Sequence, residues 1–92
     1  MQGSPRVGPP EAHVLETEID DEISLYNVQD ESVIVLNITA SDVWRLCDGE
    51  QTLDEIVGMI SRAYGVREDQ IREEVSVTVE QFIDAGFLPS PQ

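Results

Sequence analysis

Lysine is absent from this 92-residue chain, and histidine and cysteine each occur once, as His13 and Cys47. One His and one Cys cannot supply the ligands of a zinc site, and a single thiol cannot form an internal disulfide, which agrees with a reducing cytoplasm. No apolar run approaches the roughly 20 residues that cross a bilayer. The first dozen residues also lack the apolar core of a secretory signal. We therefore expect a cytoplasmic protein without a metal or a membrane segment.

Positive charge is scarce as well. Five arginines stand against nineteen acidic residues, which gives a formal net charge of −14. Such a surface repels phosphate backbones and anionic membranes, so nucleic acid and membrane are excluded as partners. The charge favours a protein or peptide partner that is neutral or basic where it docks. The same acidity would also serve solubility alone.

Catalytic groups are equally sparse. His13 lies at the edge of a segment expected to be flexible, and Cys47 falls on the apolar face of a predicted helix, where burial makes a thiol inert. Asp20, Asp21 and Glu22 lack the spacing of a calcium loop, and there is no glycine-rich phosphate loop. The sequence therefore predicts no catalytic site, no metal and no cofactor, and the protein is not expected to be an enzyme.

The first half of the chain is rich in β-formers. Alternating or fully apolar runs, separated by the polar turns 20–21 and 29–32, predict three short strands at residues 14–19, 23–28 and 33–36. Short connections between such strands favour an antiparallel meander. A Gly- and Pro-rich stretch precedes them, so residues 1–12 are expected to form a flexible tail.

The second half has helical spacing and helix-end signals. Thr39 is expected to cap a helix at residues 40–47. Thr52 with Glu55 forms a capping box for a second helix, whose apolar face is expected to include Tyr64 and which ends at Gly65. Apolar positions from about residue 68 to 85 predict a third, longer helix that ends before Gly86. The expected fold is α+β, a winged helix-turn-helix of three strands followed by three helices. The domain is expected to span residues 13–89, with a C-terminal tail at 90–92.

The run Val33, Ile34, Val35, Leu36 is apolar at every position, although successive side chains of a strand point to opposite faces. If this strand lies at the edge of the sheet, its main chain can pair with an incoming peptide strand. If both faces are buried, the run is only core. The periodicity is compatible with both interpretations.

One stretch of the sequence resembles the PqqD family. The matching residues are Leu36-Asn37-Ile38-Thr39-Ala40, Val43-Trp44, Leu46-Cys47-Asp48-Gly49 and Thr52-Leu53-Asp54-Glu55-Ile56. The resemblance extends from about Leu25 to Leu88 and is most specific at Leu46-Cys47-Asp48-Gly49 with the capped helix after it. Many of these residues would cap, turn or pack, so they indicate the fold more directly than the partner.

The resemblance implies a recognition element of ribosomally synthesised and post-translationally modified peptide (RiPP) pathways. In that family the precursor's leader segment adds as a strand beside the third strand, in a groove walled by the third helix. Carried onto this chain, the implied peptide-binding residues of the strand are Val33, Ile34, Val35 and Leu36. Those of the last helix are Asp69, Arg72, Glu73, Ser76 and Val79.

The implied partners depend on which branch of the family the chain represents. A stand-alone lasso-peptide recognition protein would deliver the leader to a transglutaminase-like leader peptidase and a cyclase. PqqD itself would present its peptide to a radical-SAM enzyme. The extended N-terminus and the acidity favour the lasso type. An acidic winged-helix domain that regulates through protein–protein contacts is an alternative from a different class.

Overall fold

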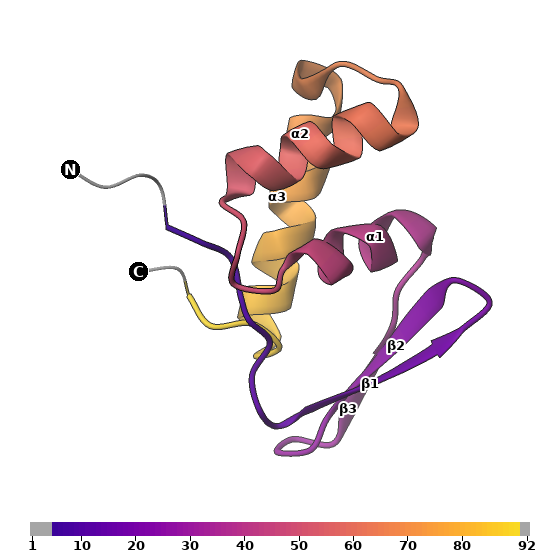
Figure 1. Ribbon diagram of the computed structural model, residues 1–92. Coiled ribbons are helices and arrows are strands. Elements are labelled where there is room, and N and C mark those ends of the chain that lie inside the picture. Colours follow the sequence, from indigo (N-terminus) through magenta and orange to yellow (C-terminus); the bar gives the residue numbers. More distant parts are fainter. Residues whose placement is uncertain (1–4, 91–92) are drawn as a thin grey trace.

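Three antiparallel strands followed by three helices make up the computed structural model, which describes residues 5–90 (Figure 1). The described elements are β1 (Val14–Ile19), β2 (Glu22–Asn27), β3 (Ser32–Val35), α1 (Ile38–Leu46), α2 (Leu53–Tyr64) and α3 (Glu68–Asp84). The predicted α+β class and element order are confirmed, with strand ends shifted by one residue at β2 and β3. No helix among residues 5–90 has the length and hydrophobicity needed to cross a membrane.

The sheet has the order β1-β2-β3 and is antiparallel throughout. Two residues, Asp20 and Asp21, join β1 to β2, and their φ angles are 53° and 69°. A two-residue hairpin whose central residues both have positive φ follows the twist of its strands, and Asp tolerates this conformation. The Asp-Asp turn therefore sets the register that places Glu16 opposite Leu25.

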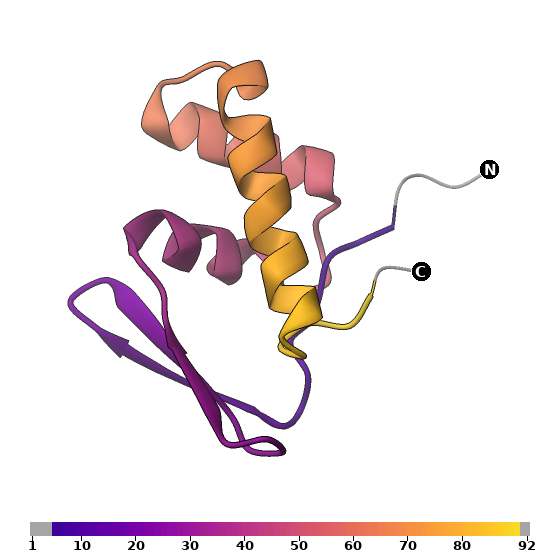
Figure 2. The same cartoon turned by 180° about the vertical axis from the view of Figure 1, so that it is seen from behind.

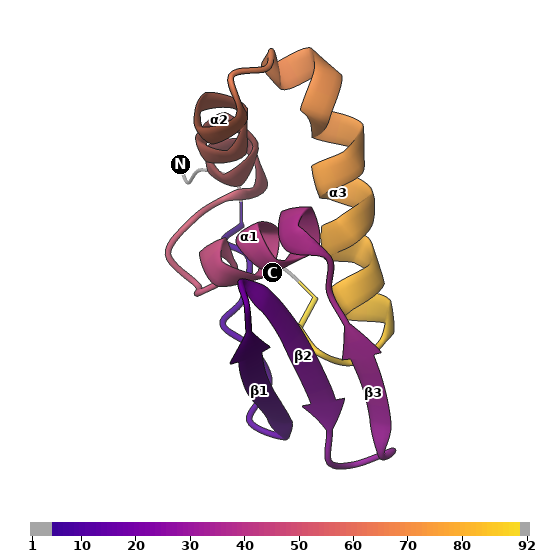
Figure 3. The same cartoon turned by 90° about the vertical axis from the view of Figure 1, so that its right-hand side faces the viewer.

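Only the middle strand packs its backbone closely against a helix, and that helix is α1. Ile23 and Leu25 of β2 are fully buried, and their side chains share the helix-facing side of the sheet with Leu36. Figure 3 shows α1 above the top of the sheet, with α3 rising above the β3 side. The core thus lies between β2 and the three helices, and the outer strands extend beyond it.

The fully buried Ser41 joins the sheet to α1. Its hydroxyl accepts a hydrogen bond from the Ile23 amide at 2.9 Å and lies 3.5 Å from the Leu36 carbonyl, to which it donates. Leu36 in turn donates its own N–H to the Ile23 carbonyl at 2.8 Å. One side chain therefore satisfies main-chain groups at the start of β2 and just beyond β3.

We expect Ser41→Ala to lower the free energy of unfolding by about 1–3 kcal/mol, because the buried Ile23 amide loses its acceptor. Urea denaturation followed by far-UV circular dichroism measures the change. Ser90→Ala, an exposed serine near the chain end, is the matched control and should change stability by less than about 0.5 kcal/mol. Equal stability of Ser41→Ala and the parent would contradict this role.

The helix ends follow the sequence signals with two corrections. Asn37, and not Thr39, caps α1, since its side chain accepts from the Ala40 amide at 2.8 Å. The predicted capping box is confirmed: Thr52 accepts from the Glu55 amide at 3.2 Å, and Glu55 accepts from the Thr52 amide at 2.8 Å.

Tyr64 is the second correction. It was expected on the apolar face of α2, yet its side chain is 37% exposed and its hydroxyl donates to Asp42 of α1 at 2.6 Å. The predicted end of α2 at Gly65 is confirmed, with the left-handed φ of 69° that glycine adopts at little cost. α3 then begins after Arg67, whose side chain has no atom that could accept a hydrogen bond from a helix amide. The Gln70 side chain accepts from the Arg67 amide instead.

Trp44 connects the sheet, α1 and α3 in the core. Its ring meets Phe82 edge to face, with centroids 5.1 Å apart and an interplanar angle of 79°. Its Nε1 donates to Glu16 of β1 at 2.8 Å, so the indole N–H is satisfied although the residue is only 3% exposed. Edge-to-face aromatic pairs contribute about 0.5–1.5 kcal/mol beyond the burial of area.

The N-terminal segment differs from the expected flexible tail over residues 5–12. Val7 is 2% exposed, donates its amide to the Gln51 carbonyl and accepts from the Gly49 amide, both at 2.8 Å. The Glu11 amide reaches the Phe87 carbonyl at 3.0 Å. One buried valine and these main-chain bonds hold the segment against the α1–α2 loop and the end of α3. Residues 1–4 and 91–92, also predicted as tails, lie outside the described residues.

Gly8 permits this close approach. A Cβ atom at Gly8 would lie 2.1 Å from the Cys47 carbonyl oxygen, and the residue has a φ of 89°. We expect Gly8→Ala to detach residues 5–11 while the rest of the fold survives, because both the contact and the backbone conformation exclude a side chain. Hydrogen exchange measures this outcome: the Val7 and Gly49 amides should exchange at least about tenfold faster. Unchanged protection at both amides would refute the tight contact.

Candidate functional site

β3 is an exposed apolar strand at the free edge of the sheet. Val33, Ile34 and Val35 are 63%, 36% and 65% exposed, while Leu36, just past the strand, is 3% exposed. Among the helices and strands, β3 contacts only β2. Of the two interpretations of this run, the structure supports the open edge for the first three residues and burial for Leu36.

The hydrogen-bond alternation of an antiparallel pair decides which main-chain groups of β3 remain available. Leu36 faces Ile23 and donates to its carbonyl, so Ile34, two residues earlier, also directs its N–H and C=O toward β2. Val33 and Val35 therefore direct theirs outward, away from the sheet. These residues present two amides and two carbonyls to an incoming strand.

The two faces of β3 differ. Ile34 shares the helix-facing side with Leu25 and Leu36, whereas Val33 and Val35 share the outer side with Tyr26 and Ser24. The outer side continues across β1 through Leu15 and Ile19, which are 56% and 66% exposed. This apolar outer face was not predicted as part of a site. Its signal was the β1 pattern, in which Leu15 and Ile19 alternate with charged Glu16 and Glu18.

The opposite edge of the sheet is protected. β1 carries Glu16, which accepts from Trp44, and Glu18, which pairs with Arg45 of α1 at 3.0 Å. Charged side chains on an edge strand discourage the addition of a further strand. β3 has no charged residue between Ser32 and Val35, so the two edges of the sheet are chemically unequal.

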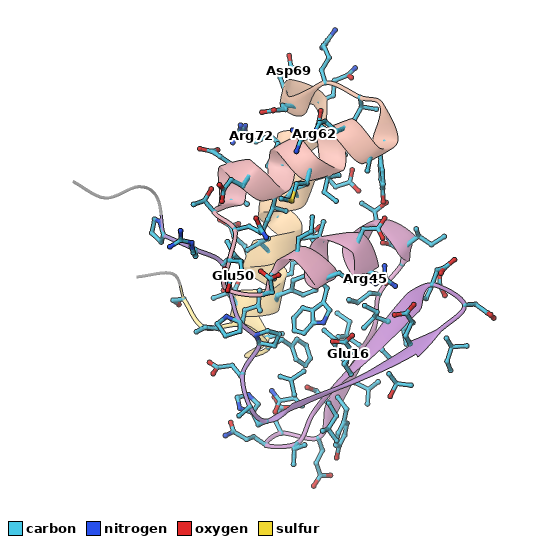
Figure 4. All side chains as sticks on the ribbon, in the orientation of Figure 1. Glu16, Arg45, Glu50, Arg62, Asp69 and Arg72 are labelled. Atoms are coloured by element: carbon cyan, nitrogen blue, oxygen red, sulfur yellow. The ribbon has the colours of Figure 1, made fainter. Side chains whose placement is uncertain are left out.

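The α3 residues predicted to wall a peptide groove are widely separated from this edge or turned from it. Asp69 pairs with Arg67 at 3.1 Å, and Arg72 pairs with Asp54 of α2 at 2.5 Å. Figure 4 shows Asp69 and Arg72 at the end of the molecule farthest from the sheet. Figure 3 shows that the C-terminal end of α3 is the part nearest to β3, and the assignment of these residues to a groove wall stays a prediction.

Ser76 and Val79 lie on the flank of α3 that faces the N-terminal segment, where they line a cavity with Val7. Val79 is 4% exposed and belongs to the core, while Glu73 is exposed. Figure 2 shows α3 in front, with β3 on one side of it and the N-terminal segment on the other. The structure therefore does not bring Ser76 and Val79 together with β3.

The other flank of α3 is marked by Glu74. Its charge helps to raise the pKa of Tyr64, after the larger effects of burial and the hydrogen bond to Asp42. Helical spacing places Glu74 opposite Ser76 and Ile83, which line the cavity near the N-terminal segment, and Figure 2 shows β3 on the other side of α3. Helical spacing puts Thr78 and Gln81 on the same flank as Glu74.

Cys47 and His13 are both engaged structurally. Cys47 is fully buried, and its Sγ donates to the Val43 carbonyl at 3.2 Å. Burial, followed by the nearby charge of Asp48, raises the pKa of Cys47 to about 12. His13 is half-buried, and its Nε2–H donates to the Gly86 carbonyl at 2.9 Å. This bond holds the side chain in place, whereas the sequence predicted a position at the edge of a flexible segment. In residues 5–90, no three His, Cys, Asp or Glu side chains gather as metal ligands.

The raised pKa of Cys47 predicts slow thiol chemistry in the folded protein. At pH 8 the folded state holds roughly a thousand times less Cys47 thiolate than a thiol of pKa 9.0 would hold, so native protein should react with Ellman's reagent far more slowly than urea-unfolded protein. The neutral thiol stabilises the fold below pH 9, and this contribution is lost as pH rises from about 9 toward 12. Equal labelling rates in native and unfolded protein would contradict the burial.

The arrangement of three strands and three helices defines a winged-helix fold with an open β3 edge. The family model of the coenzyme PQQ synthesis protein D (PqqD) matches residues 22–88. The chain belongs to the PqqD family. The search of curated proteins found no match.

A solved structure has the same fold. TbiB1, determined in complex with the TbiA(beta) leader peptide, superposes with a TM-score of 0.81. The match covers 88% of this chain and 94% of TbiB1, at 22% sequence identity. The coverage includes most of the strands and helices described above and confirms the winged-helix architecture.

Proposed function

We propose that the chain binds the leader segment of a ribosomally synthesised precursor peptide by strand addition to β3, and that it performs no catalysis itself. The observation that carries the proposal is the uncharged, exposed β3 edge, with outward main-chain groups at Val33 and Val35. Membership of the PqqD family supports it, as does the fold shared with a protein solved with a leader peptide.

Main-chain pairing would supply most of the affinity. A leader strand laid against β3 would exchange hydrogen bonds with the N–H and C=O of Val33 and Val35, each bond contributing about 0.5–1.5 kcal/mol. The β2–β3 bonds of Ile34 need not break, because they use the other side of the strand. The sheet is therefore prepared for a fourth strand without rearrangement.

Side-chain recognition would come from both faces of the added strand. On the helix-facing side the peptide meets Ile34 and the α3 flank of Glu74, Thr78 and Gln81, which replaces the predicted wall of Asp69, Arg72, Glu73, Ser76 and Val79. On the outer side it extends the exposed patch of Val33 and Val35. A leader with alternating apolar residues and a basic residue near Glu74 would complement this surface.

The bound leader would then be delivered to processing enzymes. We favour a leader peptidase of the transglutaminase type together with a cyclase, as in lasso-peptide pathways, over presentation to a radical-SAM enzyme. Precursor, protease and cyclase genes beside the gene of this chain would support the first assignment. A radical-SAM gene in their place would support the second.

Val35→Pro tests the edge. Proline removes the outward N–H of Val35 and leaves the inward bonds of Ile34 intact, so we expect leader affinity to fall at least about tenfold in a folded protein. The measurement is a titration of labelled protein with leader peptides from neighbouring precursor genes, following backbone amide shifts. In the parent protein the shifts should concentrate in β3 and on the Glu74 flank of α3.

Glu18→Pro is the matched control, because the same alternation directs the Glu18 amide outward on the opposite edge. We expect this variant to bind the leader as the parent does. Unchanged affinity in a folded Val35→Pro protein would remove β3 as the binding edge. Loss of binding only in Glu18→Pro would move the site to β1.

A further inference from the structure

A cavity of about 430 Å³ lies on the flank of α3 that faces away from β3. Val7 of the N-terminal segment, Leu53 at the start of α2 and Ile83 of α3 form much of its wall. It exists only because residues 5–7 pack against the helices, with Val7 bonded to Gln51. The cavity is therefore built from three separate parts of the chain, and none of them belongs to the β3 edge.

The rim of this cavity is acidic. Asp54 and Glu80 line it, and the Asp54 carboxylate is already paired with Arg72 at 2.5 Å. Glu80 is exposed, and no hydrogen bond or ion pair engages it among the interactions described. α3 as a whole carries six acidic residues and one arginine. The apolar wall is thus flanked by a carboxylate that can receive a cation from outside.

The chemistry of the lining argues against a small metabolite. Sites for small molecules orient their ligand with a few well-placed polar groups inside an apolar pocket. Here the only uncharged polar side chain of the lining is Ser76, which is half-buried, and both carboxylates are exposed. An apolar side chain with a basic neighbour on the same polypeptide matches an apolar wall beside Glu80.

We infer that this cavity docks a partner protein through an exposed apolar side chain flanked by Arg or Lys. The partner binds a surface that strand addition at β3 leaves free, because α3 lies between the cavity and the β3 edge (Figure 2). The domain can then hold a peptide at one flank of α3 and a basic protein at the other. The inference does not depend on the leader-peptide proposal, because no residue is shared between the two surfaces.

The test is an amide-shift titration of the labelled full chain with the capped peptide Gly-Ser-Arg-Leu-Arg-Ser-Gly. Two matched probes replace its Leu by Ala or both Arg by Glu. We expect shifts at Leu53, Ser76 and Ile83 with the first peptide, and at least threefold smaller shifts with either matched probe at equal concentration. Glu80→Arg should weaken the first peptide roughly three- to tenfold, because attraction becomes repulsion.

Asp84→Arg makes the same charge change one turn further along α3, does not line the cavity, and should bind as the parent does. Several outcomes would overturn the inference: no shifts at the cavity, equal shifts with the Ala probe, or equal weakening by Asp84→Arg. The last two would show only non-specific attraction to an acidic surface. Shifts confined to Val33 and Val35 would assign the peptide to the β3 edge and likewise exclude the cavity.

Discussion

Apolar packing of the sheet on the helices through one strand, β2, is the constraint on which the rest of the structure depends. β2 supplies Ile23 and Leu25 to the core, and Ser41 of α1 binds the main chain where β2 begins and β3 has ended. A three-stranded sheet held at its centre has two edges that the helices do not cover. The β1 edge carries charged side chains and the β3 edge is apolar, so only the β3 edge is open to a further strand.

Polar contacts of Arg45 and Trp44 join the β1 side of the sheet to α1. Arg45 pairs with Glu18 across the sheet–helix boundary and with Asp42 within α1, while Trp44 satisfies Glu16. These contacts involve partly exposed groups, so each contributes little to stability on its own. Their effect is positional: they attach the β1 side of the sheet to α1, and β3 has no equivalent attachment.

Local signals made most of the fold predictable. The box of Thr52 and Glu55 and the glycine at 65 mark helix ends through hydrogen bonds and backbone angles that depend on adjacent residues only. Tyr64 and Thr39 were assigned wrongly because the nearest competing partners, Asp42 and Asn37, decide their roles. Residue spacing shows where a cap or a packing side chain is needed. It does not show which of two nearby residues takes that role.

The site was less predictable because it depends on relations between distant segments. An apolar tetrapeptide has the same spacing whether it is buried or open. Val33 and Val35 are exposed because they lie on the outer side of the sheet, which no described element covers. The exposed face of α3 could be listed from its periodicity, but which flank faces β3 follows from the placement of α1. Val7 was missed because a single valine among Gly and Pro gives no periodic signal, although three main-chain bonds secure its segment.

An uncovered β3 is also a surface on which two copies of the chain could pair edge to edge. Each copy carries a net charge of −14, so mutual repulsion opposes this encounter over a distance set by the ionic strength. At about 0.15 M salt the screening length is about 8 Å, so the repulsion acts only when two copies come close together. The acidity that narrows the choice of partners therefore also opposes edge-to-edge pairing of two copies, and added salt weakens this repulsion.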